Sequence, residues 1–210
     1  MAHSQSRPRR PVNRICVTSL LAIVLAGCAG SVRHWTRGVQ PADDPQAARQ
    51  IAAAADASGD LERAIAETRA ALAATPNDPD LIADLGARLL RSGNPVAARR
   101  LLQRQQRRYP EHARLRIWAG WAAWMSGDDR TLRRDLRPAS PLAEDMHLYG
   151  VWLSRTSPDA ASALLRKVRL DYAARRRPID PDLVADVDCR LSTNRGRLRC
   201  PFDPPTDDVP

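Results

Sequence analysis

Residues 78–94 read DPDLIADLGARLLRSGN, and the landmarks of this stretch return at a fixed interval of 34 residues. Both the opening Asp-Pro pair and the closing Ser-Gly-Asn triplet have counterparts one interval away. The repeated landmarks are Asp44-Pro45 and Asp78-Pro79; Ser58-Gly59-Asp60, Ser92-Gly93-Asn94 and Ser126-Gly127-Asp128; Ala64 and Ala98; Pro76 and Pro110. A fixed period of this length is the signature of a chain built from similar units stacked on one another.

Each landmark has a role in a pair of antiparallel helices. Asp78 can cap a helix by accepting hydrogen bonds from its free amides, and Pro79 then occupies the first helical position, where its missing N–H is harmless. Gly93 can adopt the left-handed conformation that ends a helix, and Asn94 can cap the next one. Pro110 ends that second helix, because proline cannot continue a helix internally. The stretches between are rich in Ala, Leu and Arg, so the sequence predicts an all-α chain.

A helix-turn-helix unit of this length resembles the tetratricopeptide repeat, and the resemblance runs from about Asp44 to Leu136. The family's small residues in the first helix are matched by Ala52, Gly86 and Gly120, whereas the family's aromatic residues are largely absent. We therefore expect a tetratricopeptide-like solenoid with about three repeats over residues 44–137.

The chain after the third unit keeps its helical periodicity but no longer follows the 34-residue spacing. Pro138 and Pro141 end the second helix of the third unit early. Residues 138–175 are predicted to form a degenerate helical hairpin that caps the stack, because the last apolar face of a solenoid must be covered. Proline, aspartate and arginine dominate residues 176–210, which are predicted to be an irregular tail.

The first 27 residues have the layout of a bacterial export signal: a basic stretch, an apolar run from Ile15 to Val24, and the small-residue site Leu25-Ala26-Gly27-Cys28. The apolar run is too short for a membrane-spanning helix, which needs roughly 20 residues. The site resembles a lipobox, which implies cleavage after residue 27 and acylation of Cys28. Residues 28–43 would then be a linker. Because Ala29 stands where an aspartate would resemble an inner-membrane retention signal, we expect attachment to the periplasmic face of the outer membrane.

Removing the signal changes the charge and the cysteine count. Four of the 33 basic residues lie in residues 1–27, so the remaining 29 exceed the 24 acidic residues by only five, and a nucleic-acid partner is not indicated. Cys16 leaves with the signal and Cys28 takes the lipid. Cys189 and Cys200 remain, and an oxidising periplasm predicts a disulfide between them, across a small hairpin turning at residues 193–195.

The family resemblance implies a concave groove, lined by the first helices of successive units, that binds a peptide or a helix of a partner protein. The groove positions of the third unit hold Trp118, Trp121, Trp124 and Met125, and Arg91 belongs to the same groove in the second unit. Tryptophan often dominates binding energy, so this cluster is the candidate partner site. The alternative is burial, because the helix that carries these residues is apolar nearly all round.

The predicted tail carries two further clusters. The basic patch Arg190, Arg195, Arg197 and Arg199 can meet lipid phosphates, an acidic peptide or cell-wall carboxylates, although a solvated basic loop is the alternative. The acidic run Asp180, Asp182, Asp186 and Asp188 lacks the glycine turn and terminal glutamate of a calcium loop, so helix capping and salt bridges are expected of it.

No catalytic motif is present: the histidines are not spaced as a metal pair on one helix, and there is no phosphate loop or nucleophile elbow. We therefore expect no enzyme activity, cofactor or metal. The leading hypothesis is a lipid-anchored adaptor or assembly factor for pilus, secretion or envelope biogenesis, with a protein or peptide partner in the cell envelope. The alternative is a structural envelope lipoprotein that contacts the cell wall through its basic tail.

Overall fold

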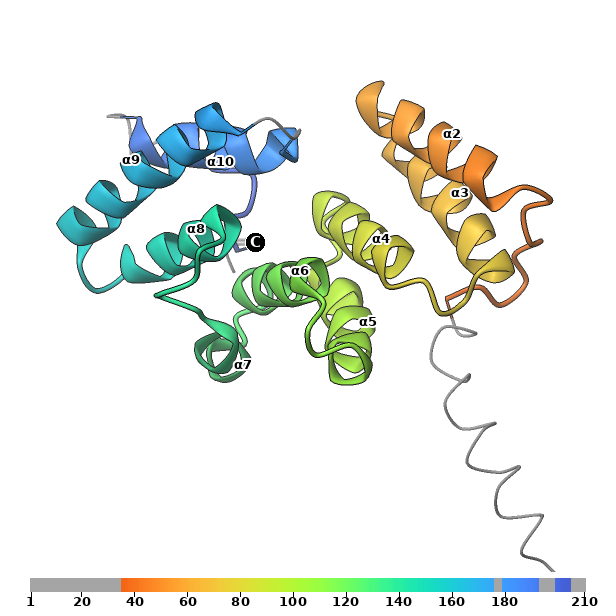
Figure 1. Cartoon of the computed structure of the whole chain (residues 1–210), viewed down its shortest axis with the longest axis horizontal. Coiled ribbons are helices and arrows are strands. Elements are labelled where there is room, and N and C mark those ends of the chain that lie inside the picture. The colour runs from red at the N-terminus through yellow and green to blue at the C-terminus, as the bar shows by residue number, and fades with distance from the viewer. Residues whose placement is uncertain (1–34, 176–178, 193–198, 205–210) are drawn as a thin grey trace, which may run out of the picture.

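The computed structural model describes residues 35–175, 179–192 and 199–204, and all regular secondary structure in these ranges is helical. The helices follow one another as antiparallel pairs along an arch, whose two ends rise on either side of α4 and α6 (Figure 1). Their bounds are α2 Pro45–Ala57, α3 Leu61–Ala74, α4 Pro79–Arg91, α5 Pro95–Arg108, α6 Ala113–Met125, α7 Asp129–Asp135, α8 Ala143–Leu153, α9 Pro158–Ala174 and α10 Pro181–Leu191. This architecture confirms the predicted helical-hairpin solenoid.

The turn inside each of the first three pairs follows the repeated triplet. Gly59, Gly93 and Gly127 have φ angles of 80°, 75° and 69°, in the left-handed region that glycine adopts without strain. Asp60 and Asp128 then cap the next helix, as expected. Asn94 does not cap α5; its side-chain amide donates to the carbonyl oxygen of Ser92 instead, at 3.1 Å.

The first helices begin and pack as the repeat pattern predicted. Asp44 and Asp78 accept hydrogen bonds from the first amides of α2 and α4, and Pro45 and Pro79 follow them. Gly86 lies so close to the second helix of its own pair that an added Cβ atom would stand 2.5 Å from a methyl carbon of Leu102. The small residue in the first helix therefore sets the distance between α4 and α5.

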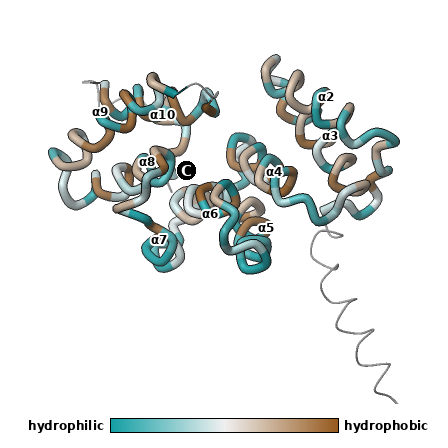
Figure 2. Tube along the Cα trace, viewed as in Figure 1, coloured by the Kyte–Doolittle hydropathy of each residue, from teal (hydrophilic) through white to brown (hydrophobic). Residues whose placement is uncertain are grey.

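The third pair is shorter than the first two, because α7 has only 7 residues, and the fourth pair joins helices of unequal length, with 11 residues in α8 and 17 in α9. α7 ends at Asp135, three residues before Pro138, and the chain is extended at Leu136. α8 and α9 form the capping pair, in which Leu148, Val151, Leu165 and Val168 are buried. Teal dominates the outer sides of α5 and α7 in Figure 2, whereas α6 and α8 are paler or brown.

The prediction of an irregular tail is wrong for residues 181–191, which form α10. Asp180-Pro181 is the same helix-start signal as Asp44-Pro45: the Asp180 side chain accepts from the amide of Asp182, and the proline takes the first helical position. Leu183 and Val187, one turn apart, are buried against the rest of the structure. Cys189 consequently lies on a helix and not on the arm of a small hairpin.

Candidate functional site

α6 carries the tryptophan cluster, and the structure buries it. Trp118, Trp121 and Trp124 expose 4%, 0% and 4% of their surface, and Met125 exposes 7%. The expectation that these four side chains line an open groove is therefore wrong, and the alternative of burial holds. The physical reason is that α6 is apolar on both sides, so neighbouring elements cover both of its faces.

The chain's own C-terminal segment, residues 199–204, covers the concave side of α6. Phe202 is 1% exposed, and its ring centroid lies 4.8 Å from that of Trp121 and 6.0 Å from that of Trp118. The indole N–H of Trp124 donates to the carbonyl oxygen of Phe202 at 2.9 Å. On its other side the Trp124 ring meets the guanidinium of Arg155, 4.0 Å from the ring centroid. A segment of the chain itself thus occupies the place where a partner peptide was expected.

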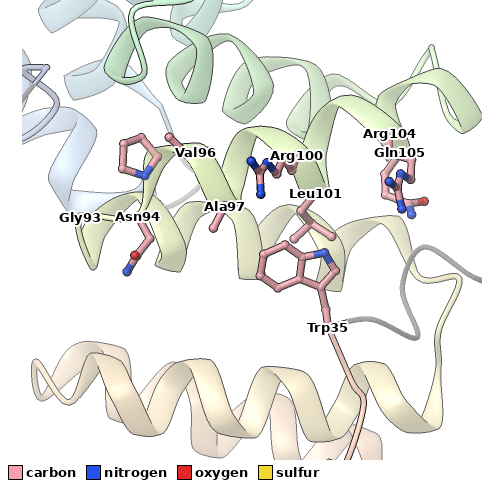
Figure 3. A pocket seen from close by; sticks show the side chains of 10 residues that line it. Trp35, Gly93, Asn94, Val96, Ala97, Arg100, Leu101, Arg104 and Gln105 are labelled. Atoms are coloured by element: carbon pink, nitrogen blue, oxygen red, sulfur yellow. The ribbon is translucent and has the colours of Figure 1, made fainter.

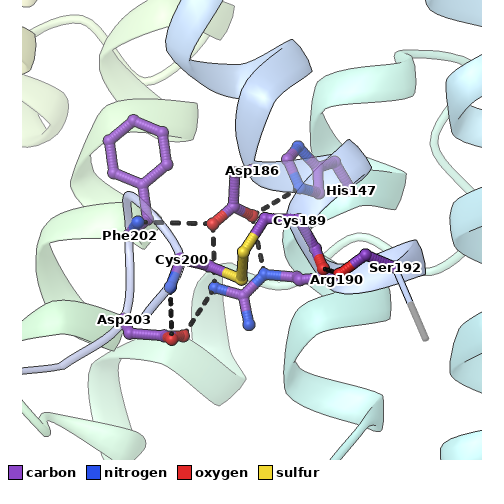
Figure 4. The surroundings of a disulfide bond; sticks show 8 residues. All are labelled: His147, Asp186, Cys189, Arg190, Ser192, Cys200, Phe202 and Asp203. Carbon is purple, nitrogen blue, oxygen red and sulfur yellow. Dashed lines mark hydrogen bonds and ion pairs between the residues drawn. A yellow bond between two sulfur atoms is a disulfide. The ribbon is translucent and has the colours of Figure 1, made fainter. Parts of the chain in front are cut away.

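The predicted disulfide between Cys189 and Cys200 is present and ties this segment to α10 (Figure 4). Asp203 stabilises the turn that follows Cys200. Its carboxylate accepts a hydrogen bond from the backbone amide of Cys200 at 2.9 Å and pairs with Arg190 at 2.9 Å. The covalent bond and these contacts together hold Phe202 over α6.

Asp186 stands at the centre of a buried polar cluster beside the disulfide (Figure 4). Its carboxylate contacts Nε2 of His147 at 2.9 Å, Nε of Arg190 at 2.6 Å and the backbone amide of Phe202 at 3.3 Å. Burial alone would raise the pKa of Asp186, but the hydrogen bond from His147 and the charge of Arg190 outweigh it and lower the pKa. A buried carboxylate therefore joins α8, α10 and the C-terminal segment.

His147 completes the cluster as a neutral ring. Burial lowers its pKa, since the charged imidazolium would lose its hydration. Because the Asp186 carboxylate can only accept, Nε2 carries the proton, and Nδ1 accepts from the Tyr172 hydroxyl at 3.2 Å. Both ring nitrogens are occupied and the side chains of His147 and Asp186 are fully buried, so this histidine–aspartate pair has a structural and not a catalytic geometry.

Arg91 is also committed to contacts within the chain. Its guanidinium lies 3.1 Å from the Asp56 carboxylate on α2 and 3.5 Å from that of Asp182 on α10. It therefore connects both ends of the arch across α4 and does not stand alone in the groove.

A smaller cleft of about 380 Å³ remains on the concave side, beside α10. It is lined by Arg114, Ile117, Trp118, Glu144, Arg175, Ile179, Asp180 and Leu183. Arg114 is half exposed at its rim and pairs with Asp80 at 3.1 Å and with Asp84. Glu144 pairs with Arg175 at 2.7 Å through Oε1, whereas its buried Oε2 has no hydrogen-bond partner among the described residues. The cleft combines an apolar floor with an unsatisfied acceptor.

The predicted basic patch is not one exposed cluster in the part of the tail that the structure describes. Arg190 is mostly buried and paired with Asp186 and Asp203, because α10 turns it inward. Arg199 donates to the carbonyl oxygen of Pro204 at 3.1 Å. Arg195, Arg197 and Cys28, the predicted acylation site, lie outside the described residues.

The acidic run serves capping and ion pairing, as predicted. Asp180 caps α10, and Asp182, Asp186 and Asp188 pair with Arg91, Arg190 and Arg169 respectively. Within residues 35–175, 179–192 and 199–204, no three His, Cys, Asp or Glu side chains are grouped as metal ligands. No helix in the same ranges is long and apolar enough to cross a membrane.

Sequence reasoning missed Phe202 and His147, whose rings pack on Trp121, and Asp186, whose carboxylate joins them. One signal was available: Phe202 is the only phenylalanine of the chain and lies two residues after a disulfide cysteine. A lone large apolar residue in a polar tail, held close to a covalent cross-link, is a candidate for docking onto the core.

Comparison with known proteins identifies the repeats. A tetratricopeptide repeat family model matches residues 55–117, from the end of α2 into α6. No curated protein and no solved structure matches the chain. Tetratricopeptide repeats generally mediate protein–protein interactions, and their all-helical fold is typically a scaffold without catalytic function. The family match and the 34-residue helical hairpins together show tetratricopeptide-type repeats in this part of the chain.

Proposed function

We propose that the protein is a lipid-anchored adaptor or assembly factor of the bacterial cell envelope, which binds a segment of a partner protein in the concave cleft beside α10. It supplies a binding surface and catalyses no reaction. The proposal rests on the repeat family, whose members generally bind proteins, and on the lipobox at residues 25–28.

The observation that carries the binding site is the cleft of about 380 Å³ between α6, α8 and α10. Ile117 and Leu183 give it an apolar floor, and Arg114 offers a half-exposed guanidinium at the rim. The buried Oε2 of Glu144 has no donor among the described residues, so a backbone or side-chain N–H of a bound segment would satisfy it. Apolar contact with a few convergent polar groups is the usual composition of a specific binding site.

Site-specific photo-crosslinking in cells tests this proposal. A photoreactive residue replaces Arg114 at the cleft or, as the matched control, Arg169 on α9, which is a partly exposed, ion-paired arginine that does not line the cleft. We expect a discrete protein adduct from position 114 and none from position 169. Equal labelling at both positions, or no adduct at 114, would exclude the cleft as the partner site.

The anchor has its own test. Cys28→Ala removes the acylation site of the lipobox, and no described helix can span a membrane. We expect this variant to lose labelling by a fatty-acid probe and to leave the membrane fraction. A Cys28→Ala protein that still takes up the probe would contradict the proposed anchor.

A further inference from the structure

α5 stands out from the other helices by its charge. Its sequence, PVAARRLLQRQQRR, holds five arginines and no acidic residue. Arg100, Arg104 and Arg107 are exposed and follow the i, i+4, i+7 spacing of one helix face. Among the described residues these three side chains form no ion pair, whereas Arg99 on the same helix pairs with Asp128 at 2.8 Å. The cationic stripe is therefore not neutralised within the described structure.

An aromatic side chain lies beside this stripe. Trp35, from the segment that precedes α2, packs against Leu101 of α5 (Figure 3). The two elements enclose a cleft of about 690 Å³, which Ala97, Arg100 and Arg104 also line. Val96, at the start of the stripe, is 45% exposed, one of only three large hydrophobic residues exposed among those described. Charged and apolar groups thus alternate on one open surface.

The positive surface continues from α5 toward α7. Arg107, Arg134 and Arg137 line a second hollow, of about 450 Å³. The one carboxylate in its lining, Asp135, is 6% exposed and is paired with Arg134 at 3.0 Å. No exposed acidic side chain in the lining opposes the arginines.

We propose that this surface, the α5 face (Trp35, Val96, Arg100, Arg104 and Arg107), docks on an anionic phospholipid bilayer. The guanidinium groups contact lipid phosphates, for which arginine has matching donor geometry. Trp35 and Val96 lie at the boundary between headgroups and acyl chains, where tryptophan is enriched. The α5 face would thus set the orientation of the whole arch on its membrane, with the opening between α2 and α10 directed away from it.

The choice of a lipid surface over another polyanion rests on the position of Trp35 in the chain. Trp35 follows the proposed acylation site Cys28 by seven residues, which span at most about 25 Å when fully extended. The choice of a bilayer as the binding partner of the α5 face therefore rests on the proposed lipid anchor at Cys28. A cell-wall polymer or a nucleic acid would use the arginines but would give no role to the exposed Val96.

Fluorescence quenching on vesicles tests the orientation. A fluorophore is attached to Val96→Cys or, as the control, to Leu170→Cys on α9, which is 71% exposed. The full-length protein is mixed with phosphatidylglycerol/phosphatidylcholine vesicles that carry a headgroup quencher. We expect at least about threefold stronger quenching at position 96 than at position 170, with the difference lost in high salt because screening weakens the contact with phosphates. Equal quenching at the two positions would overturn the proposal.

A charge variant tests the role of the arginines. Arg100→Gln/Arg104→Gln/Arg107→Gln should abolish the preferential quenching at position 96 and weaken the charge-dependent part of vesicle binding on the order of 100-fold, about fivefold for each charge. The matched control, Arg63→Gln/Arg166→Gln/Lys167→Gln, removes three exposed charges on α3 and α9 that line neither of the two hollows at α5, and it should leave the quenching unchanged. Circular dichroism checks that both variants are folded.

Two further outcomes separate the hypotheses. Flotation with neutral phosphatidylcholine vesicles reports the lipid anchor alone. If the wild-type protein does not float with these vesicles, the proposed anchor is contradicted, and the quenching assay still tests whether the α5 face binds the bilayer. If the triple variant instead loses binding to isolated peptidoglycan, with no preferential quenching at position 96 in vesicles, the α5 face recognises the cell wall and the bilayer proposal is wrong.

Discussion

Replacing Phe202 with alanine removes the side chain that closes the concave side of α6. The ring is 1% exposed and its centroid lies 4.8 Å from that of Trp121, so its loss leaves a cavity. The segment that carries residue 202 cannot move far from this cavity, because the disulfide holds it to α10. Phe→Ala changes at such sites destabilise by about 3–5 kcal/mol. For a domain of about 150–250 residues, each kcal/mol lowers the melting temperature by about 2–4 °C, so we expect a decrease of about 6–20 °C.

Thermal melting followed by far-ultraviolet circular dichroism measures this decrease, with Leu170→Ala as the control. Leu170 is 71% exposed, and its truncation should change the stability by less than about 0.5 kcal/mol. Tryptophan emission provides a second measurement, since Trp118 and Trp121 gain contact with water when Phe202 is lost. The smallest decrease in melting temperature expected per kcal/mol is about 2 °C. A Phe202→Ala protein with unchanged tryptophan emission and a melting temperature within about 2 °C of the wild type would show that residues 199–204 do not pack on α6.

Three other predictions follow from the buried cluster. Trp121→Ala should lower the free energy of unfolding, measured in urea, by about 3–5 kcal/mol. Trp121→Phe should lower it by clearly less, because the buried indole N–H has no hydrogen-bond partner among the described residues and its removal costs no hydrogen bond. Equal losses in the two variants would contradict this account. The pKa of His147 is held below its ordinary 6.5, so the unfolded chain binds a proton that the folded chain does not, and the free energy of unfolding should fall below about pH 6.5 by up to about 1.4 kcal/mol per pH unit. The midpoint of urea unfolding is measured between pH 7.5 and 5, at steps of about half a pH unit. The wild type and the control His112→Gln should lose stability as the pH falls, and His147→Gln should lose less. The same pH dependence in all three proteins would refute this role of His147. Protein purified under non-reducing conditions should show no reactive thiol at Cys189 or Cys200 before reduction and a mass gain of two hydrogens after it, and reactive thiols at both positions would contradict the disulfide.

The repeat architecture was predictable because its signals are local. Asp78-Pro79 starts a helix and Gly93 ends one through backbone preferences that act within a few residues, and the 34-residue period multiplies the evidence. The same rules apply to Asp180-Pro181, but no second copy of this pair lies at the expected interval. The prediction of an irregular tail gave more weight to the density of proline and aspartate than to this single start signal, and α10 was missed.

The candidate site was harder to predict because its contacts connect distant parts of the chain. Trp124 and Phe202 are 78 positions apart, and His147 and Asp186 are 39 apart. An apolar helix such as α6 shows from its sequence that both of its faces are covered, but not which segment covers them. From the sequence, the tryptophans could either line an open groove or lie in the core. Only the folded structure shows that they lie in the core.

The C-terminal segment on α6 also has a consequence for the order in which the chain folds. Contacts within and between successive hairpins join residues that are close in sequence, and such contacts form early and fast. Phe202 reaches α6 only after the chain has been synthesised beyond residue 202, so until then Trp118, Trp121 and Trp124 lack their cover on that side. Cys189 and Cys200 are only 11 positions apart, so their disulfide can close before the segment docks, and it then holds Phe202 close to α10. A chain truncated before Cys200 would keep its helices but expose an aromatic surface, which is the condition under which partly folded proteins aggregate.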